Sequence, residues 1–152
     1  MPTLNGRGVR LDLPAGWDGR IYRREPVPPE QTFTVVHAAN FSLPPDCGDY
    51  GNGAVDIMSA HNILMCLLEF EPRHAGDPLF ARSSQPQALP PQRFDRTTLQ
   101  HGLPGQVGAQ QFFSASERAW SLFVVLGHVN LLNDLVPVVN DVLGSLRIEA
   151  YS

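Results

Sequence analysis

Alternation of hydrophobic and polar residues near the start of the chain predicts short strands. Residues 9–13 (VRLDL) are apolar at every second position, the period of a half-buried strand. A turn is expected at residues 14–16 (PAG), and residues 20–25 (RIYRRE) alternate again. The prolines within residues 26–29 lack the N–H that a sheet ladder needs. We therefore expect residues 9–13 and 20–25 to pair as a first hairpin with a rigid exit.

The middle of the chain contains two further predicted strands. Residues 33–41 (FTVVHAANF) are apolar at alternate positions, and His37 falls on the apolar side. Residues 62–70 (NILMCLLEF) are apolar on both sides. Such a pattern is expected of a central strand with both of its faces covered.

The second half of the chain predicts a long irregular crossing followed by a hairpin. Residues 72–106 contain six prolines, and so long a connection needs isolated anchors to the core. The candidate anchors are Phe80, Leu89, Phe94 and Leu99. Residues 107–114 and 119–127 then flank a polar connection of four residues, which is a typical hairpin length.

A helix is predicted after the last hairpin, because the period of the pattern changes. Apolar residues recur at i, i+4, i+7 and i+11, on one face of a helix: Leu135, Val139, Val142 and Leu146. Asp134 is the expected N-cap, which places Pro137 in the first turn. Gly144 suits the end of the helix, and residues 146–148 predict a short edge strand.

Together these elements predict an α+β fold. Counting gives about seven strands, the helix just described, and a short helix near residues 54–58. Because hairpins dominate, we expect a mainly antiparallel sheet of six to seven strands flanked by helices. The 152 residues fit one domain, residues 1–152.

Composition narrows the classes of function. Charged residues make up 17% of the chain, against roughly 25% in typical soluble domains, and the net charge is −4. This composition argues against a nucleic-acid partner. All eleven basic residues are arginine, which excludes a P-loop lysine and Schiff-base chemistry. No apolar run has the length of a signal peptide core or a membrane span, so we expect a cytoplasmic protein without a membrane partner.

Residues 47–61 (CGDYGNGAVDIMSAH) contain a thiol, two carboxylates, a phenol and an imidazole, several of which could bind a metal ion or a phosphate. The spacing matches no zinc, calcium or dinucleotide motif. We expect a structural loop, in which glycines adopt positive φ and Asp46 and Asp49 form turns. No metal or cofactor is predicted. Cys47 and Cys66 are expected as thiols, and a disulfide between them stays an alternative.

A candidate pocket is suggested by His37 and Glu69. Both residues lie on apolar sides of their predicted strands, and a partly buried carboxylate there could orient the imidazole. A histidine satisfied within the core is the competing interpretation. No serine or cysteine lies in a nucleophile motif, so no catalytic residue is predicted.

A candidate partner surface is suggested by a basic and aromatic cluster in the first part of the chain. Its members are Trp17, Arg20, Tyr22, Arg23 and Arg24. Arginine and aromatic side chains are frequent anchors for acidic partners. The same charges could instead protect a sheet edge against pairing with another sheet.

Two segments resemble the PsbP/Mog1-like fold group. Residues 11–20 (LDLPAGWDGR) are similar to the turn out of the first strand in that group, and residues 139–149 (VNDVLGSLRIE) to its closing helix and strand. Residues 103–113 (LPGQVGAQQFF) and 122–127 (LFVVLG) also resemble uncharacterised actinobacterial proteins. The resemblance implies an antiparallel sheet between helices and a binding or accessory role, since Mog1-like domains bind a small GTPase. It carries no catalytic residues to this chain.

The leading expectation is therefore a non-enzymatic cytoplasmic binding or accessory module that engages a protein partner. The alternative is a small enzyme or ligand-binding protein with a pocket near His37 and Glu69. We expect a monomer or a weak homodimer.

Overall fold

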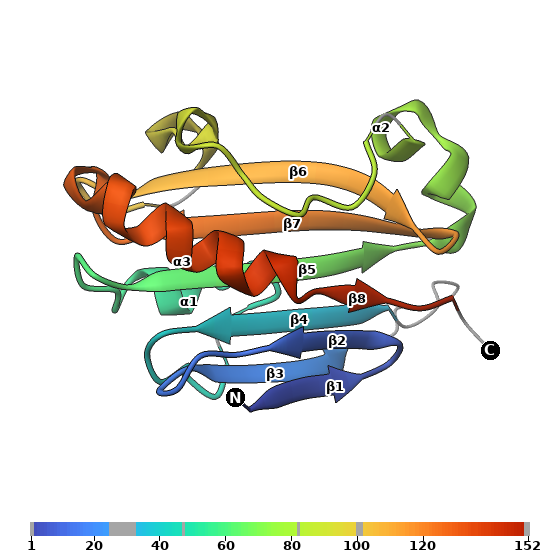
Figure 1. Ribbon diagram of the computed structural model, residues 1–152, viewed down its shortest axis with the longest axis horizontal. Coiled ribbons are helices and arrows are strands. Elements are labelled where there is room, and N and C mark those ends of the chain that lie inside the picture. The colour runs from blue at the N-terminus through green and yellow to red at the C-terminus, as the bar shows by residue number, and fades with distance from the viewer. Residues whose placement is uncertain (1, 25–32, 47, 82, 100–101, 151–152) are drawn as a thin grey trace.

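The computed structural model describes residues 2–24, 33–46, 48–81, 83–99 and 102–150 (Figure 1). Their strands are β1 (Thr3–Gly6), β2 (Val9–Asp12), β3 (Asp18–Arg23), β4 (Thr34–Ala39), β5 (Ile63–Phe70), β6 (Val107–Ala115), β7 (Arg118–Leu126) and β8 (Arg147–Ile148). The α-helices are α1 (Asn52–Val55), α2 (Pro78–Ala81) and α3 (Leu132–Gly144). Short 3₁₀ turns are η1 (Pro72–Gly76), η2 (Pro91–Arg93), η3 (Arg96–Thr98) and η4 (Val129–Leu131). The fold is α+β with antiparallel strands, as predicted, but these strands form two sheets, whereas a single sheet of six to seven strands was expected.

The larger sheet has the strand order β3-β4-β5-β7-β6, with β5 at its centre. Its two faces support different cores. Ile63, Met65 and Leu67 of β5 belong to the core that includes α3, and we call this side the α3 face. The alternate residues of β5 belong to the core beneath α1, the α1 face. As expected, β5 is apolar at both odd and even positions, because both of its faces are covered.

The remaining strands form a second, smaller sheet in the order β1-β2-β8. The expected hairpin between residues 9–13 and 20–25 is wrong, because β2 pairs with β1 and β8 while β3 pairs with β4. A tight turn at Arg7 and Gly8, both with positive φ, returns the chain from β1 to β2. Both edges of β2 are then occupied, so β3 joins the other sheet. The proline-rich exit lies outside the described residues.

The β6–β7 hairpin has a tighter turn than its sequence indicates. The expected connection was residues 115–118, but Ala115 and Arg118 pair with each other. Only Ser116 and Glu117 form the turn, with φ of 51° and 65°. Two successive residues of positive φ match the right-handed twist of the flanking strands.

The helix and the short elements differ from expectation mainly at their boundaries. α3 begins at Leu132, so Asp134 lies in its first turn and is not the N-cap. The preceding turn η4 is capped by His128, whose Nδ1 accepts from the Asn130 N–H. Pro137 lies inside α3, which ends at Gly144 as predicted. The predicted edge strand is β8, and α1 begins two residues before the expected Ala54.

The long crossing between β5 and β6 covers the outer edge of β6. Asp95 and Gly108 exchange two main-chain hydrogen bonds of 2.9 Å, and Ser114 N–H donates to Ser83 O. Of the predicted anchors, Phe80, Leu89 and Phe94 are buried and Leu99 is partly buried. β3 is thus left as the other edge strand of the larger sheet.

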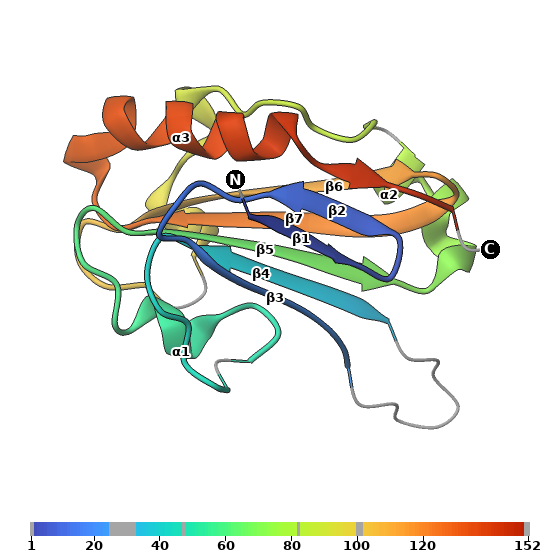
Figure 2. The ribbon, with the colours of Figure 1, turned by 60° about the horizontal axis from the view of Figure 1, so that its bottom comes forward.

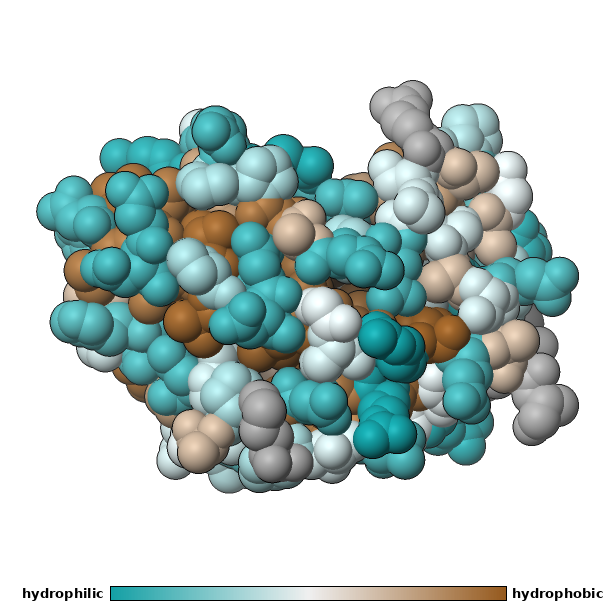
Figure 3. Space-filling model, in the orientation of Figure 1, coloured by the Kyte–Doolittle hydropathy of each residue, from teal (hydrophilic) through white to brown (hydrophobic). Residues whose placement is uncertain are grey.

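The layers are clearest in Figure 2, where α3 and the smaller sheet lie above the larger sheet and α1 lies below one end of it. Figure 3 shows the side of α3, on which hydrophilic side chains predominate and hydrophobic ones appear between them. No helix in the described part of the chain is long and apolar enough to cross a membrane.

Candidate functional site

Glu69 and Arg118 form a fully buried ion pair on the α3 face. Arg118 Nε donates to Glu69 Oε2 at 2.9 Å, and Nη2 donates to Oε1 at 3.2 Å. The two side chains are 0% and 1% exposed. Thr34 N–H also donates to Glu69 Oε1, and Arg118 Nη1 donates to Glu149 O. The carboxylate is therefore held within the fold by several donors.

His37 lies on the opposite face of the sheet from Glu69. It stands directly across from Cys66 on β5, and cross-strand partners share a face. Glu69 is three residues from Cys66, an odd number, so its side chain leaves the other face. The expected pairing of His37 with Glu69 is therefore not formed. Because β5 is apolar at both odd and even positions, its sequence did not indicate on which face of the sheet the Glu69 side chain lies.

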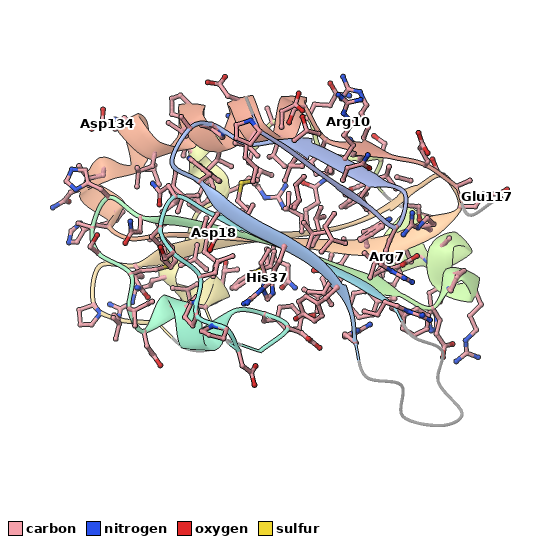
Figure 4. The ribbon with its side chains drawn as sticks, turned by 90° about the horizontal axis from the view of Figure 1, so that it is seen from below. Arg7, Arg10, Asp18, His37, Glu117 and Asp134 are labelled. Atoms are coloured by element: carbon pink, nitrogen blue, oxygen red, sulfur yellow. The ribbon has the colours of Figure 1, made fainter. Side chains whose placement is uncertain are left out.

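The ring of His37 is buried and bonded at both nitrogens. Nε2 lies 2.8 Å from Asp49 O, and Arg20 Nε donates to Nδ1 at 3.2 Å. Since a guanidinium only donates, Nδ1 is the acceptor and Nε2 carries the proton, so the ring is neutral. Burial lowers the pKa of His37 below 6.5, the Asp49 carbonyl opposes this, and the Arg20 charge adds to the lowering. In Figure 4 His37 lies below the strands, on the side of α1.

Arg20 and Tyr22 extend this network to the loop before α1. Arg20 Nη1 donates to Pro44 O and Pro45 O at 2.8 and 3.0 Å. Tyr22 OH donates to Asp49 Oδ1 at 2.8 Å, and the Tyr22 ring meets His37 edge-on at 5.5 Å.

The glycine-rich loop has part of the predicted turn geometry, but Gly53 lies in α1 without positive φ. Gly48 and Gly51 have φ of 77° and 76°, and Asp46 Oδ1 accepts from Gly48 N–H. Asp49, the other expected turn former, instead binds Tyr22 and His37. The described residues contain no group of three or more His, Cys, Asp or Glu that could hold a metal ion. Cys66 is buried, while Cys47 and the alternative disulfide lie outside the described residues.

Arg24 differs from the other half-buried arginines in what surrounds it. Its Nη2 donates to Glu69 O at 2.6 Å, and its Cζ lies 5.6 Å from the Phe33 ring centroid and 5.9 Å from that of Phe70. No described carboxylate forms an ion pair with it. Phe70 in turn packs on Phe80 at 5.3 Å. We call Arg24, Phe33 and Phe70 the Arg24 platform.

Tyr50, in the loop before α1, packs against the same core as Phe70 of the Arg24 platform. Its ring meets Phe123 edge-on at 6.0 Å and is partly buried. Burial raises the pKa of Tyr50 above 10.0, and the positive charge of Arg24 opposes that rise. The arginine and the phenol are therefore close enough to interact electrostatically.

The structure divides the predicted partner surface between two sides of β3. Because side chains alternate along a strand, Arg20, Tyr22 and Arg24 lie together on the α1 face. Arg23 is exposed on the other side, and Trp17 packs against the core of the α3 face. Phe33, Phe70 and Tyr50 were missed because they come from separate segments, and only strand pairing brings them beside Arg24.

A small cavity on the α3 face carries no site. Its lining is apolar and includes Leu11, Val36 and Leu143, so it offers a ligand no polar group. No protein-family model, curated protein or solved structure matches this chain.

Proposed function

We propose that this protein is a non-enzymatic binding module that engages an acidic group of a protein partner at the Arg24 platform. The observation that carries the proposal is a half-buried guanidinium that is positioned by two rings and one carbonyl and has no described carboxylate partner. The remaining N–H donors of the Arg24 guanidinium can bind a carboxylate in bidentate geometry.

The surroundings of Arg24 favour binding of an anion. Stacking on Phe33 and Phe70 orients the guanidinium before a partner arrives, which reduces the entropy lost on binding. The neighbouring rings of Tyr22 and Tyr50 are only partly buried. Arginine and tyrosine are the residue types that most often dominate the energy of protein interfaces.

The two residues of the alternative hypothesis are engaged elsewhere. His37 is bonded at both ring nitrogens, and the Glu69 carboxylate is enclosed by Arg118 and Thr34. A general base needs an accessible lone pair directed at a substrate. These contacts favour binding over a catalytic pocket built from His37 and Glu69.

The decisive experiment compares two adjacent arginines. We would use the protein, Arg24→Gln and Arg23→Gln as baits in a lysate of the source organism and identify captured proteins by mass spectrometry. Arg23→Gln is the matched control, because it removes the same charge from the neighbouring position on the other side of β3. We expect a partner whose affinity falls by about tenfold or more with Arg24→Gln and is retained with Arg23→Gln. Equal capture by all three baits would contradict the proposal.

A further inference from the structure

The segment between β4 and α1 is held to the sheet by side chains. No main-chain hydrogen bond joins the described residues of 41–50 to a strand. Instead, Arg20 holds two carbonyls at Pro44 and Pro45, and His37 and Tyr22 hold Asp49. Asp18 Oδ2 also accepts from Leu43 N–H. These bonds fix Asp49, the residue before Tyr50, while the Tyr50 ring itself packs on Phe123.

This network requires a neutral His37. The described groups that face its ring and can titrate or carry charge are Arg20 and Tyr22 on β3, Asp49 in the loop, and Cys66 on β5. A proton added to Nδ1 would point at Arg20 Nε–H across a distance of 3.2 Å. Two donors and two positive charges would then oppose each other. Arg20 would have to turn away, and it is the residue that holds Pro44 and Pro45.

We propose that His37 is a pH-sensitive latch, which in its neutral form holds the loop residues 44–46 and 48–50 against β3 and β4 and on protonation releases them. Release moves Tyr50 away from the Arg24 platform. The consequence for binding rests on the proposed function: an acidic partner binds more weakly at acidic pH because Tyr50 no longer stands on the same face as Arg24.

The direction of the pH effect follows from linkage. While the loop is closed over it, the pKa of His37 is lowered, whereas His37 exposed to solvent by loop opening has the ordinary value near 6.5. Opening therefore takes up a proton, and it becomes more favourable as pH falls below 6.5. At pH 5 the opening equilibrium gains up to about 30-fold over its value at pH 7.5.

Hydrogen exchange of the full chain tests the latch. We would measure amide protection of residues 41–55 at pH 7.5 and pH 5, corrected for intrinsic exchange, with α3 as an internal reference for global unfolding. In the wild type we expect a loss of protection of ~30-fold at most that is confined to the loop. His37→Gln should lose no protection at pH 5, because a glutamine amide can donate to Asp49 O and accept from Arg20 without titrating. Arg20→Gln should leave the loop unprotected at both pH values.

A second measurement keeps the test independent of variants. The ring resonance of His37 in the wild type, followed by NMR, should titrate with the same midpoint as loop opening. Unchanged protection at pH 5, an equal acid effect in His37→Gln, or different midpoints would overturn the latch. The capture comparison of Arg24→Gln and Arg23→Gln at pH 7.5 is made with the loop closed, so it tests the binding site separately.

Discussion

At the scale of single residues, buried polar groups are matched to fixed partners. His37 is held as one neutral tautomer by Arg20 and the Asp49 carbonyl, and the Glu69 carboxylate accepts two hydrogen bonds from Arg118. An unpaired polar group at these positions would lower the stability of the fold by on the order of 1–3 kcal/mol, and an unpaired charge by more. Arg24 is positioned by two rings and a carbonyl, and like Arg7 it forms no ion pair with a described carboxylate.

Tyr50 provides a spectroscopic test of the geometry around Arg24. Because the Arg24 charge lowers the pKa of Tyr50 against the effect of burial, Arg24→Gln should raise that pKa further. The measurement is an absorbance titration at alkaline pH, and Tyr50→Phe assigns the late-titrating phenol. Since the folded pKa lies above the ordinary 10.0, the contribution of Tyr50 to stability is present below pH 10 and is lost as pH rises through the folded value. An unchanged titration in Arg24→Gln would place Arg24 too far from Tyr50.

At the scale of elements, turns and close approaches determine where each strand ends. The β1–β2 and β6–β7 hairpins both use consecutive residues of positive φ. The end of β7 is defined by Gly127, whose N–H donates to Asn62 O. The main chain before β5 passes so close to Gly127 that an added Cβ would overlap the oxygens of Ser59 and Ala60.

Gly127→Ala should therefore destabilise the protein by about 3 kcal/mol, because main-chain atoms cannot move aside as a flexible side chain can. Gly144→Ala is the matched control, since an added Cβ at Gly144 meets nothing within 4 Å. It should change stability by about 0.5 kcal/mol or less. Denaturant unfolding of both variants gives the comparison. Equal changes in stability for Gly127→Ala and Gly144→Ala would show that residues 59–60 leave enough space for a side chain at position 127.

At the scale of the whole molecule, a buried polar network joins the two sheets. Arg118 reaches from β7 to Glu69 on β5 and to the carbonyl of Glu149 just after β8. Thr34 on β4 donates to Glu69, and Arg7 in the β1–β2 turn donates to Thr34 Oγ1 at 2.9 Å. In Figure 4 Arg7 and Glu117 lie at this same end of the molecule. The smaller sheet is thus tied to the larger one by charge-assisted hydrogen bonds as well as by hydrophobic packing.

Glu69→Gln should lower the free energy of unfolding by about 3–5 kcal/mol, because it leaves Arg118 buried without a counter-charge. Glu117→Gln removes an exposed carboxylate from the nearby turn and should cost about 0.5 kcal/mol or less. Denaturant titration measures both values. Amide exchange should also show β1 and β2 opening more readily in Glu69→Gln. Similar stabilities of the two variants would mean that the ion pair contributes little to the joining of the sheets.

The candidate site was only partly predictable from the sequence. The expected cluster of Trp17, Arg20, Tyr22, Arg23 and Arg24 is divided in the structure. Alternation along β3 keeps Arg20, Tyr22 and Arg24 together, whereas Arg23 and Trp17 lie on the other side. The sequence indicates that His37 lies among apolar residues. It does not indicate that Arg20 and Asp49 are its partners, because the register between strands is not visible in any one segment. The apolar patterns of residues 33–41 and 62–70 predict Phe33 and Phe70 only as members of strands. Their role in positioning Arg24 arises from pairing between strands far apart in sequence.

The amino-acid sequence by itself determined the number and type of most elements, the two-sided burial of β5, and the turns at Asp46, Gly48 and Gly51. These features follow from the period of apolar residues and from local backbone preferences, which act within a few residues. Only the tertiary structure decided that β2 and β3 belong to different sheets. It also decided that the side chains of His37 and Glu69 lie on opposite faces of the larger sheet. Those outcomes depend on which strands pair and in which register, and register is set by packing across the whole molecule.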